Sequence, residues 1–186
     1  MKRTAILCAF SVTAFAIPRR DESTSGLPLY QDPSASVDAR TADLLARMTL
    51  EEKVAQMLNP VGSSDGPGGF QVNATEVLAH YATTGLGTLY IGIDGCPGHL
   101  DNYACHNYVQ QSFINSSRLS IPVSFIGETL VAGAAGGTIF PQPVLRGASF
   151  NLELEARIGS SIARQARLGG IDRGLSPVLQ VDTDVR

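Results

Sequence analysis

The side chain best suited to binding or catalysis is that of Glu128, which follows an apolar stretch at 121–127. The continuous apolar character of this stretch predicts a strand buried on both faces, as in a parallel sheet. A carboxylate at the carboxyl end of such a strand would lie on the functional edge of a barrel. There it can accept hydrogen bonds from the hydroxyl groups of a ligand. A solvated loop glutamate fits the residue types equally well, so both interpretations stay open.

A nucleophilic serine is not supported. Residues 62–66 have the letters of a G-x-S-x-G nucleophile elbow, which requires a strand before the serine and a helix after it. Here Asn59-Pro60 precedes the motif, and a Pro-Gly-Gly sequence follows it. We therefore reject a serine hydrolase.

The histidines do not suggest a metal site either. His80 falls on an expected helix, and His99 and His106 flank Cys105 in an expected loop, without H-x-x-x-H or C-x-x-C spacing. We interpret all three as surface or hydrogen-bonded histidines. We expect neither a metal nor a cofactor.

The first residues predict a secretory signal peptide. Lys2 and Arg3 precede an apolar run from Thr4 to Ala16 that ends in an A-x-A pattern, and the run is shorter than the ~20 residues of a membrane span. A buried N-terminal helix is the alternative, which the polar residues after Pro18 disfavour. We expect residues 1–16 to be removed and the protein to be secreted and extracellular, with no membrane segment left.

Removal of the signal would also remove Cys8 and leave Cys96 and Cys105 in an oxidising compartment. We expect a disulfide between these two, with a pair of buried free thiols as the alternative. Two N-x-[ST] acceptors, at Asn73 and Asn115, predict glycosylation and agree with secretion.

Composition excludes some partners. The chain has 186 residues, of which 44% are hydrophobic and 17% charged, as in an ordinary globular protein. Its 14 basic residues against 17 acidic ones include no run beyond Arg19-Arg20, so we expect no nucleic-acid partner and no anionic membrane.

Hydrophobic periodicity and turn residues predict alternating helices and strands after an extended linker at 17–36. Thr49 and Glu52 form an expected capping box at the start of one helix, and Asn151 is an expected cap of another. The expected helices begin near residues 37 and 50 and cover 75–83, 107–116 and 151–168; the strands cover 87–93, 122–127 and 176–181, and 61–70 is a loop. This order predicts an α/β fold with a parallel sheet, open or closed into a barrel.

Several segments resemble patterns of glycoside hydrolase family 3, in the family's order. They are Met48–Val54 (M-T-L-E-E-K-V), Arg118–Pro122 (R-L-G-I-P in the family), Gly137–Gln142 (G-A-T-x-F-P-Q), Ile162–Gly169 (I-A-R-E-A-R-A-L-G) and Leu175–Val181 (L-A-P-V-L-D-V). The chain departs from the family at Val131-Ala132, where H-G is common, and at Gln180, where aspartate is usual.

The resemblance implies that residues 37–186 are a truncated (β/α)8 barrel with roughly its first three strands. It implies an exo-acting, retaining β-glycosidase of the β-glucosidase type, whose partner is a β-linked glucoside or xyloside oligosaccharide. Such enzymes use two carboxyl groups about 5 Å apart. By family position both would lie beyond Arg186, so this chain would carry no catalytic residue and would be inactive alone. Glu128 and Arg186 would bind the terminal sugar. A non-catalytic or vestigial carbohydrate-binding fragment is the alternative.

Overall fold

A computed structural model describes residues 26–60, 63–66, 69–99, 101–133, 137–178 and 183. The expected signal peptide and the predicted sugar ligand Arg186 lie outside the described residues. The chain divides into two compact units, Met1–Ala46 and Arg47–Arg186. No helix in the described part of the chain combines the length and the apolar character that crossing a membrane requires.

The first unit contains a short 3-10 helix, η1 (Leu29–Gln31), and most of α1 (Val37–Arg47). The backbone N–H of Tyr30 donates to the Asp43 carboxylate at 3.0 Å, and the Arg40 guanidinium donates to the Tyr30 carbonyl at 3.0 Å. These bonds hold η1 against α1. The described part of the expected linker is therefore folded onto the helix that follows it.

The second unit begins with α2 (Leu50–Ala55), and its predicted capping box is confirmed. The Thr49 hydroxyl accepts from the Glu52 N–H at 3.2 Å, while the Glu52 carboxylate accepts from the Thr49 N–H at 2.9 Å. The same carboxylate pairs with Arg118 at 2.6 Å, and this guanidinium also donates to the Arg47 carbonyl at 2.7 Å. Sequence positions 66 residues apart are thus joined at the start of α2.

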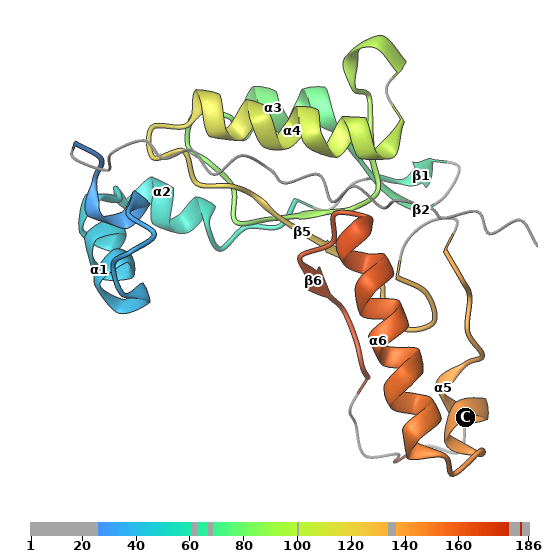
Figure 1. Cartoon of the computed structure of the whole chain (residues 1–186). Coiled ribbons are helices and arrows are strands. Elements are labelled where there is room, and N and C mark those ends of the chain that lie inside the picture. Colours follow the sequence, from blue (N-terminus) through green and yellow to red (C-terminus); the bar gives the residue numbers. More distant parts are fainter. Residues whose placement is uncertain are drawn as a thin grey trace, which may run out of the picture. The chain divides into compact units, whose positions relative to one another are not determined.

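The strands of this unit form two small sheets (Figure 1). In one, β1 (Ser63–Gly66) pairs antiparallel with β2 (Gly69–Asn73), and β2 pairs parallel with β4 (Ile93–Asp94). In the other, β3 (Thr88–Tyr90), β5 (Ser124–Gly127) and β6 (Arg173–Gly174) are all parallel. The predicted α/β fold with a parallel sheet is therefore present.

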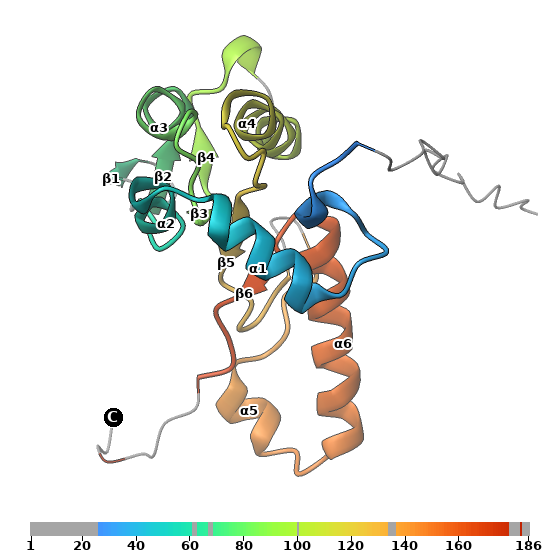
Figure 2. The same cartoon turned by 90° about the vertical axis from the view of Figure 1, so that its left-hand side faces the viewer.

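Helices connect and cover these strands: α3 (Ala74–Tyr81), η2 (Pro97–His99), α4 (Asn102–Ser116), α5 (Pro143–Gly147) and α6 (Leu152–Leu168). The helices α3 and α4 run side by side (Figures 1 and 2). Beneath them lies the main core, which includes the fully buried Leu86, Leu89, Val109 and Phe113. This core fixes β3 and β5 with their carboxyl ends at the same edge of the sheet.

The helix α6 matches its prediction closely. The Asn151 side chain accepts from the Leu154 N–H at 2.9 Å, and Gly169 ends the helix. Four apolar residues recur at a spacing of four; Ile158, Ile162 and Ala166 are buried, whereas Leu154, in the first turn, is 41% exposed. The periodic apolar pattern therefore identified the face that α6 buries.

Three predictions that concern strands were wrong. The glycine-rich segment 61–70, expected as a loop, contains β1 and the start of β2. The expected strand 87–93 is divided, because the Ile91 N–H still bonds to Ile126 whereas the Gly92 carbonyl accepts from Val72 in the other sheet. The third strand of this sheet is Arg173–Gly174, and residues 176–178 of the expected strand 176–181 are not in a strand, because Pro177 lacks a donor for the ladder. Residues 179–182 lie outside the described part.

Candidate functional site

The parallel strands β3, β5 and β6 place their carboxyl ends at one edge of their sheet. The first residues beyond these ends are Ile91, Glu128 and Leu175. Glu128 is the only carboxylate among these three, and its side chain is exposed. The predicted position of Glu128, directly after a buried strand, is thus correct. Its role in binding sugar stays a prediction.

Tyr90, at the end of β3, lies near Glu128. Tyr90 pairs in register with Ile126, and Glu128 follows Ile126 by two positions, directly past the end of β5, so the alternation of the strand places Glu128 on the same face. Burial raises the pKa of the Tyr90 phenol, and the nearby Glu128 carboxylate raises it further. The phenol is therefore neutral at neutral pH and can donate a hydrogen bond beside an acceptor carboxylate. This pairing suits the hydroxyl groups of a sugar.

Tyr90 and Arg173 were not predicted from the sequence. Arg173 pairs with Ile126 from the other side of β5 and shares its face. Tyr90 was missed because the first strand was expected to continue to residue 93, which placed the tyrosine mid-strand. Arg173 was missed because the third strand was expected to begin at residue 176. The glycines on either side of 88–91 were the signal for an earlier strand end.

Behind the edge, Thr129 and Gly174 fit closely together. The Thr129 hydroxyl lies 2.6 Å from the Ser176 hydroxyl, and the Thr129 side chain is buried. A Cβ atom at position 174 would overlap the Thr129 hydroxyl, so glycine is required there for this approach. Thr129, the residue after Glu128, is thus held against β6 and the segment that follows it.

His106 supports the edge from α4. Its Nε2 lies 2.7 Å from the Ile91 carbonyl, to which it must donate, and its ring stacks on Phe125 with the centroids 4.9 Å apart. Only 5% of His106 is exposed. The expectation of a hydrogen-bonded histidine is met, but His106 and Cys105 lie in a helix rather than in the loop that was expected.

The two cysteines are joined by a disulfide in the structure. Cys96 follows β4, and Cys105 lies in the first turns of α4, with the Cα atoms 5.7 Å apart. The bond joins residues nine positions apart in the sequence and connects the end of β4 to α4. Cys105 is 1% exposed, so this link belongs to the core that carries the strands.

The two predicted glycosylation acceptors have different surroundings. Asn73 caps α3, where its side-chain oxygen accepts from the Glu76 N–H at 3.1 Å. Its amide group also lies against Gly95. Asn115 is exposed in the last turn of α4, with its oxygen accepting from the Gln111 amide at 2.8 Å. Glycosylation of both remains a prediction.

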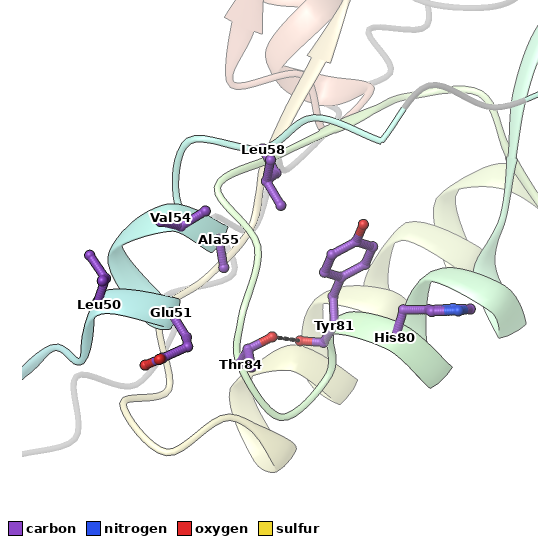
Figure 3. Close-up of a pocket in the computed structure, with 8 residues that line it drawn as sticks. All are labelled: Leu50, Glu51, Val54, Ala55, Leu58, His80, Tyr81 and Thr84. Carbon is purple, nitrogen blue, oxygen red and sulfur yellow. Dashed lines mark hydrogen bonds between the residues drawn. The ribbon is translucent and has the colours of Figure 1, made fainter.

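A groove of about 400 Å³ lies between α2 and α3 (Figure 3). Its lining is mostly apolar: Leu50, Val54, Ala55 and Leu58 from one side and Tyr81 from the other, with Glu51, His80 and Thr84. The Ala55 and Leu58 carbonyls accept from the N–H groups of Gly87 and Thr88. The groove therefore lies near the amino end of β3, opposite the edge that carries Glu128, and few of its groups suit a sugar.

No group of three histidine, cysteine, aspartate or glutamate residues within the described ranges could hold a metal ion. Residue 64, at the centre of the rejected nucleophile elbow, lies inside β1 rather than at a turn into a helix.

Comparison with known proteins identifies the family. A model of the glycosyl hydrolase family 3 N terminal domain matches residues 49–186, which includes nearly all of the second unit. The chain belongs to glycosyl hydrolase family 3. Its match begins at the α2 capping box, so the family domain and the second compact unit start within two residues of each other.

Relatives in family 3 carry glycosidase names. A putative beta-xylosidase of Formosa agariphila is 33% identical over 168 residues, which cover 84% of this chain and 21% of that protein. Probable beta-glucosidase C of Aspergillus oryzae is 45% identical over 53 residues, 28% of this chain and 8% of that protein. The same-named protein of Aspergillus flavus is 46% identical over 52 residues, with the same coverage. The chain thus spans about a fifth of the length of the beta-xylosidase.

Proposed function

We propose that this chain supplies the sugar-binding edge of an exo-acting, retaining β-glycosidase that removes glucose or xylose from the end of a β-linked oligosaccharide. Membership of glycosyl hydrolase family 3 supports hydrolysis of glycosidic bonds in general. The names of its relatives support β-glucosides and β-xylosides as the substrate class.

The observation that carries the proposal is the position of Glu128, beside the Tyr90 phenol and directly after a buried parallel strand. An ionised carboxylate accepts hydrogen bonds from two neighbouring ring hydroxyl groups, and a neutral phenol donates one. A few polar groups that converge at the carboxyl edge of parallel strands are typical of ligand sites in barrel enzymes.

The strands β3, β5 and β6 would form an arc of a (β/α)8 barrel. Their parallel pairing, with helices between them in sequence, supports this architecture. Retaining hydrolysis needs a nucleophile and an acid/base about 5 Å apart. Glu128 is the only carboxylate among the first residues after the three strand ends, so these positions supply no pair of acids. The family resemblance then implies positions beyond Arg186 for both roles.

Secretion is part of the same proposal. The disulfide between Cys96 and Cys105 is typical of proteins from oxidising compartments. An exposed Asn115 on α4 offers an accessible glycan acceptor. Expression in a eukaryotic secretory host, with mass analysis before and after enzymatic removal of N-glycans, tests both points. A product retained in the cell, with residues 1–16 uncleaved, would contradict them.

The function is tested by release of the chromophore from aryl β-glucosides and aryl β-xylosides. We expect none from the 186-residue chain, and we expect release from a chain extended along its reading frame to the whole family domain. Release by the short chain would overturn the assignment of the reacting acids. An inactive extended chain that is correctly folded would overturn the function.

A non-catalytic sugar-binding protein is the second candidate, because Glu128 and Tyr90 are suitable ligands without a second acid beside them at the strand ends. Titration calorimetry of the 186-residue chain with glucose, xylose and cellobiose separates the two functions. Measurable affinity in the short chain favours the binder, whereas affinity that appears only in the extended chain favours the enzyme.

A further inference from the structure

Arg146, on α5, is a buried cation with two partners. One guanidinium nitrogen, Nη1, pairs with the Glu155 carboxylate of α6 at 3.1 Å, and the other, Nη2, donates to the Leu130 carbonyl at 3.2 Å. The Arg146 side chain is only 9% exposed. Its third nitrogen, Nε, is buried and has no hydrogen-bond partner among the described residues.

The Leu130 carbonyl belongs to the rim segment, which we define as residues 128–131. Every residue of this segment after Glu128 is tied down: Thr129 to the Ser176 hydroxyl at 2.6 Å, Leu130 to Arg146, and the Val131 carbonyl to the Phe140 N–H at 2.8 Å. Glu128 itself is exposed. The exposed carboxylate thus stands at the start of an anchored segment.

The downstream end of the segment is also held. Gly133 lies so close to α6 that a Cβ atom would overlap the Ile162 carbonyl and crowd the Ala166 nitrogen. The helices α5 and α6 therefore fix the chain from Leu130 to Gly133, and Arg146 is the side chain that connects both helices to the rim segment.

Fold stability alone does not account for Arg146. Removing a guanidinium from water is costly, and an ion pair whose carboxylate, that of Glu155, is 47% exposed returns little stability, so the loss of this pair to apolar residues costs little. An arginine differs from such residues because its planar fork fixes two acceptors at once in a set geometry. Here those acceptors are a helix carboxylate and the carbonyl two residues after Glu128.

We propose that Arg146 is a positioning residue, which holds the rim segment so that Glu128 is already in place before a sugar binds. Ordering a loop during binding reduces affinity, so a segment held in advance favours the bound state. Glu155 acts with Arg146 by fixing the orientation of its guanidinium. The effect of Arg146 on sugar binding rests on the proposed function, whereas its hold on the rim segment does not.

The first test needs no sugar. Hydrogen exchange in the purified chain compares the wild type with Arg146→Met, Arg146→Lys and the paired variant Arg146→Met/Glu155→Met. In the single and paired methionine variants we expect the Phe140 amide, whose bond to the Val131 carbonyl reports on the rim segment, to exchange at least about tenfold faster, while the α4 amides are unchanged. The lysine variant should be intermediate, because an ammonium group can reach one partner at a time. Arg157→Met, an exposed arginine on α6, is the matched control and should exchange as the wild type does.

The paired variant separates positioning from stability, because it leaves no unpaired charge. We expect its denaturation midpoint to be closer to that of the wild type than the midpoint of Arg146→Met is, while hydrogen exchange that reports on its rim segment stays fast. Wild-type exchange of the rim segment in that variant would overturn the proposal, as would unchanged exchange in Arg146→Met. If Arg146→Met does not fold, the paired and lysine variants decide.

The second test uses the extended chain and an aryl β-glycoside. We expect Arg146→Met/Glu155→Met to raise KM about tenfold and to leave kcat within about twofold, since the reacting acids lie elsewhere. An unchanged KM in a variant whose rim segment shows fast hydrogen exchange would overturn the link between Arg146 and sugar binding. If the extended wild type itself is inactive, the proposed function fails, and the exchange results alone decide whether Arg146 positions the segment.

Discussion

At the residue level, the ion pair between Glu52 and Arg118 makes the stability of the family domain depend on pH. The hydrogen bonds from the Arg118 guanidinium lower the pKa of Glu52, and the Thr49 N–H assists while burial opposes them. A carboxyl group with a lowered folded pKa stabilises the fold fully above its unfolded pKa of about 4.3, and this contribution is lost as pH falls through the folded pKa.

Arg118→Met should therefore reduce the free energy of unfolding by about 1–2 kcal/mol at neutral pH, where the Glu52 carboxylate loses a charged partner. The difference from the wild type should shrink as the pH falls below the unfolded pKa of about 4.3, and it should vanish only below the lowered folded pKa of Glu52. Urea denaturation over a pH series measures it. Arg164→Met, exposed on α6, is the control. A difference that stays constant down to low pH would show that Arg118 acts through packing and its bond to the Arg47 carbonyl rather than through the ion pair.

Tyr90 reports on the position of Glu128 without any ligand. Burial and the Glu128 carboxylate both raise the Tyr90 pKa, so Glu128→Gln should bring this pKa part of the way back toward its ordinary value of about 10. Ultraviolet titration of tyrosinate, with Tyr90→Phe subtracted, isolates this phenol. An identical Tyr90 titration in the wild type and Glu128→Gln would mean that the two groups are not neighbours.

At the level of elements, a glycine controls how the segment after α2 meets β3. A Cβ atom at Gly87 would overlap the backbone carbonyl of Gln56, which side-chain motion cannot relieve, whereas Gly159 in α6 has open space around its Cβ position. We expect Gly87→Ala to cost about 1–3 kcal/mol of stability and Gly159→Ala to add about 0.5–1 kcal/mol. Chemical denaturation of both variants compares the same change at two sites. A neutral Gly87→Ala would contradict the close approach of β3.

Elements with local signals were predictable from sequence, and those that depend on distant partners were not. The capping box at Thr49 and the apolar face of α6 are set by residues within one or two turns. By contrast, β1 consists of glycine, serine and aspartate and becomes a strand only by pairing with β2. The break at Gly92 likewise depends on a bond to Val72, far away in the sequence.

The candidate site was predictable in part for the same reason. Glu128 follows a strand whose apolar run is visible in the sequence, so its position was correct. Tyr90 and Arg173 face the same side only because β3 and β6 pair with β5 in a particular register, which local patterns do not encode.

For the molecule as a whole, the described part of the family domain leaves apolar surface and strand edges uncovered. Within its parallel sheet β3 and β6 are the outer strands, and Leu50 and Met57 are 73% and 84% exposed. Such surfaces promote association. We expect the purified 186-residue chain to form concentration-dependent oligomers in light scattering, and the chain extended to the whole family domain to be less associated. A strictly monomeric short chain that unfolds cooperatively would indicate a self-sufficient fold and contradict the barrel arc.

The most direct test of the central claim is hydrolysis of an aryl β-glucoside or β-xyloside by the extended chain in which only Glu128 is changed. If Glu128 binds hydroxyl groups of the terminal sugar, Glu128→Gln should lower kcat/KM at least about 100-fold, because buried sugar hydroxyls lose a charged acceptor, while the exposed Glu153→Gln on α6 should have no effect. A Glu128→Gln enzyme with wild-type kcat/KM would contradict the account.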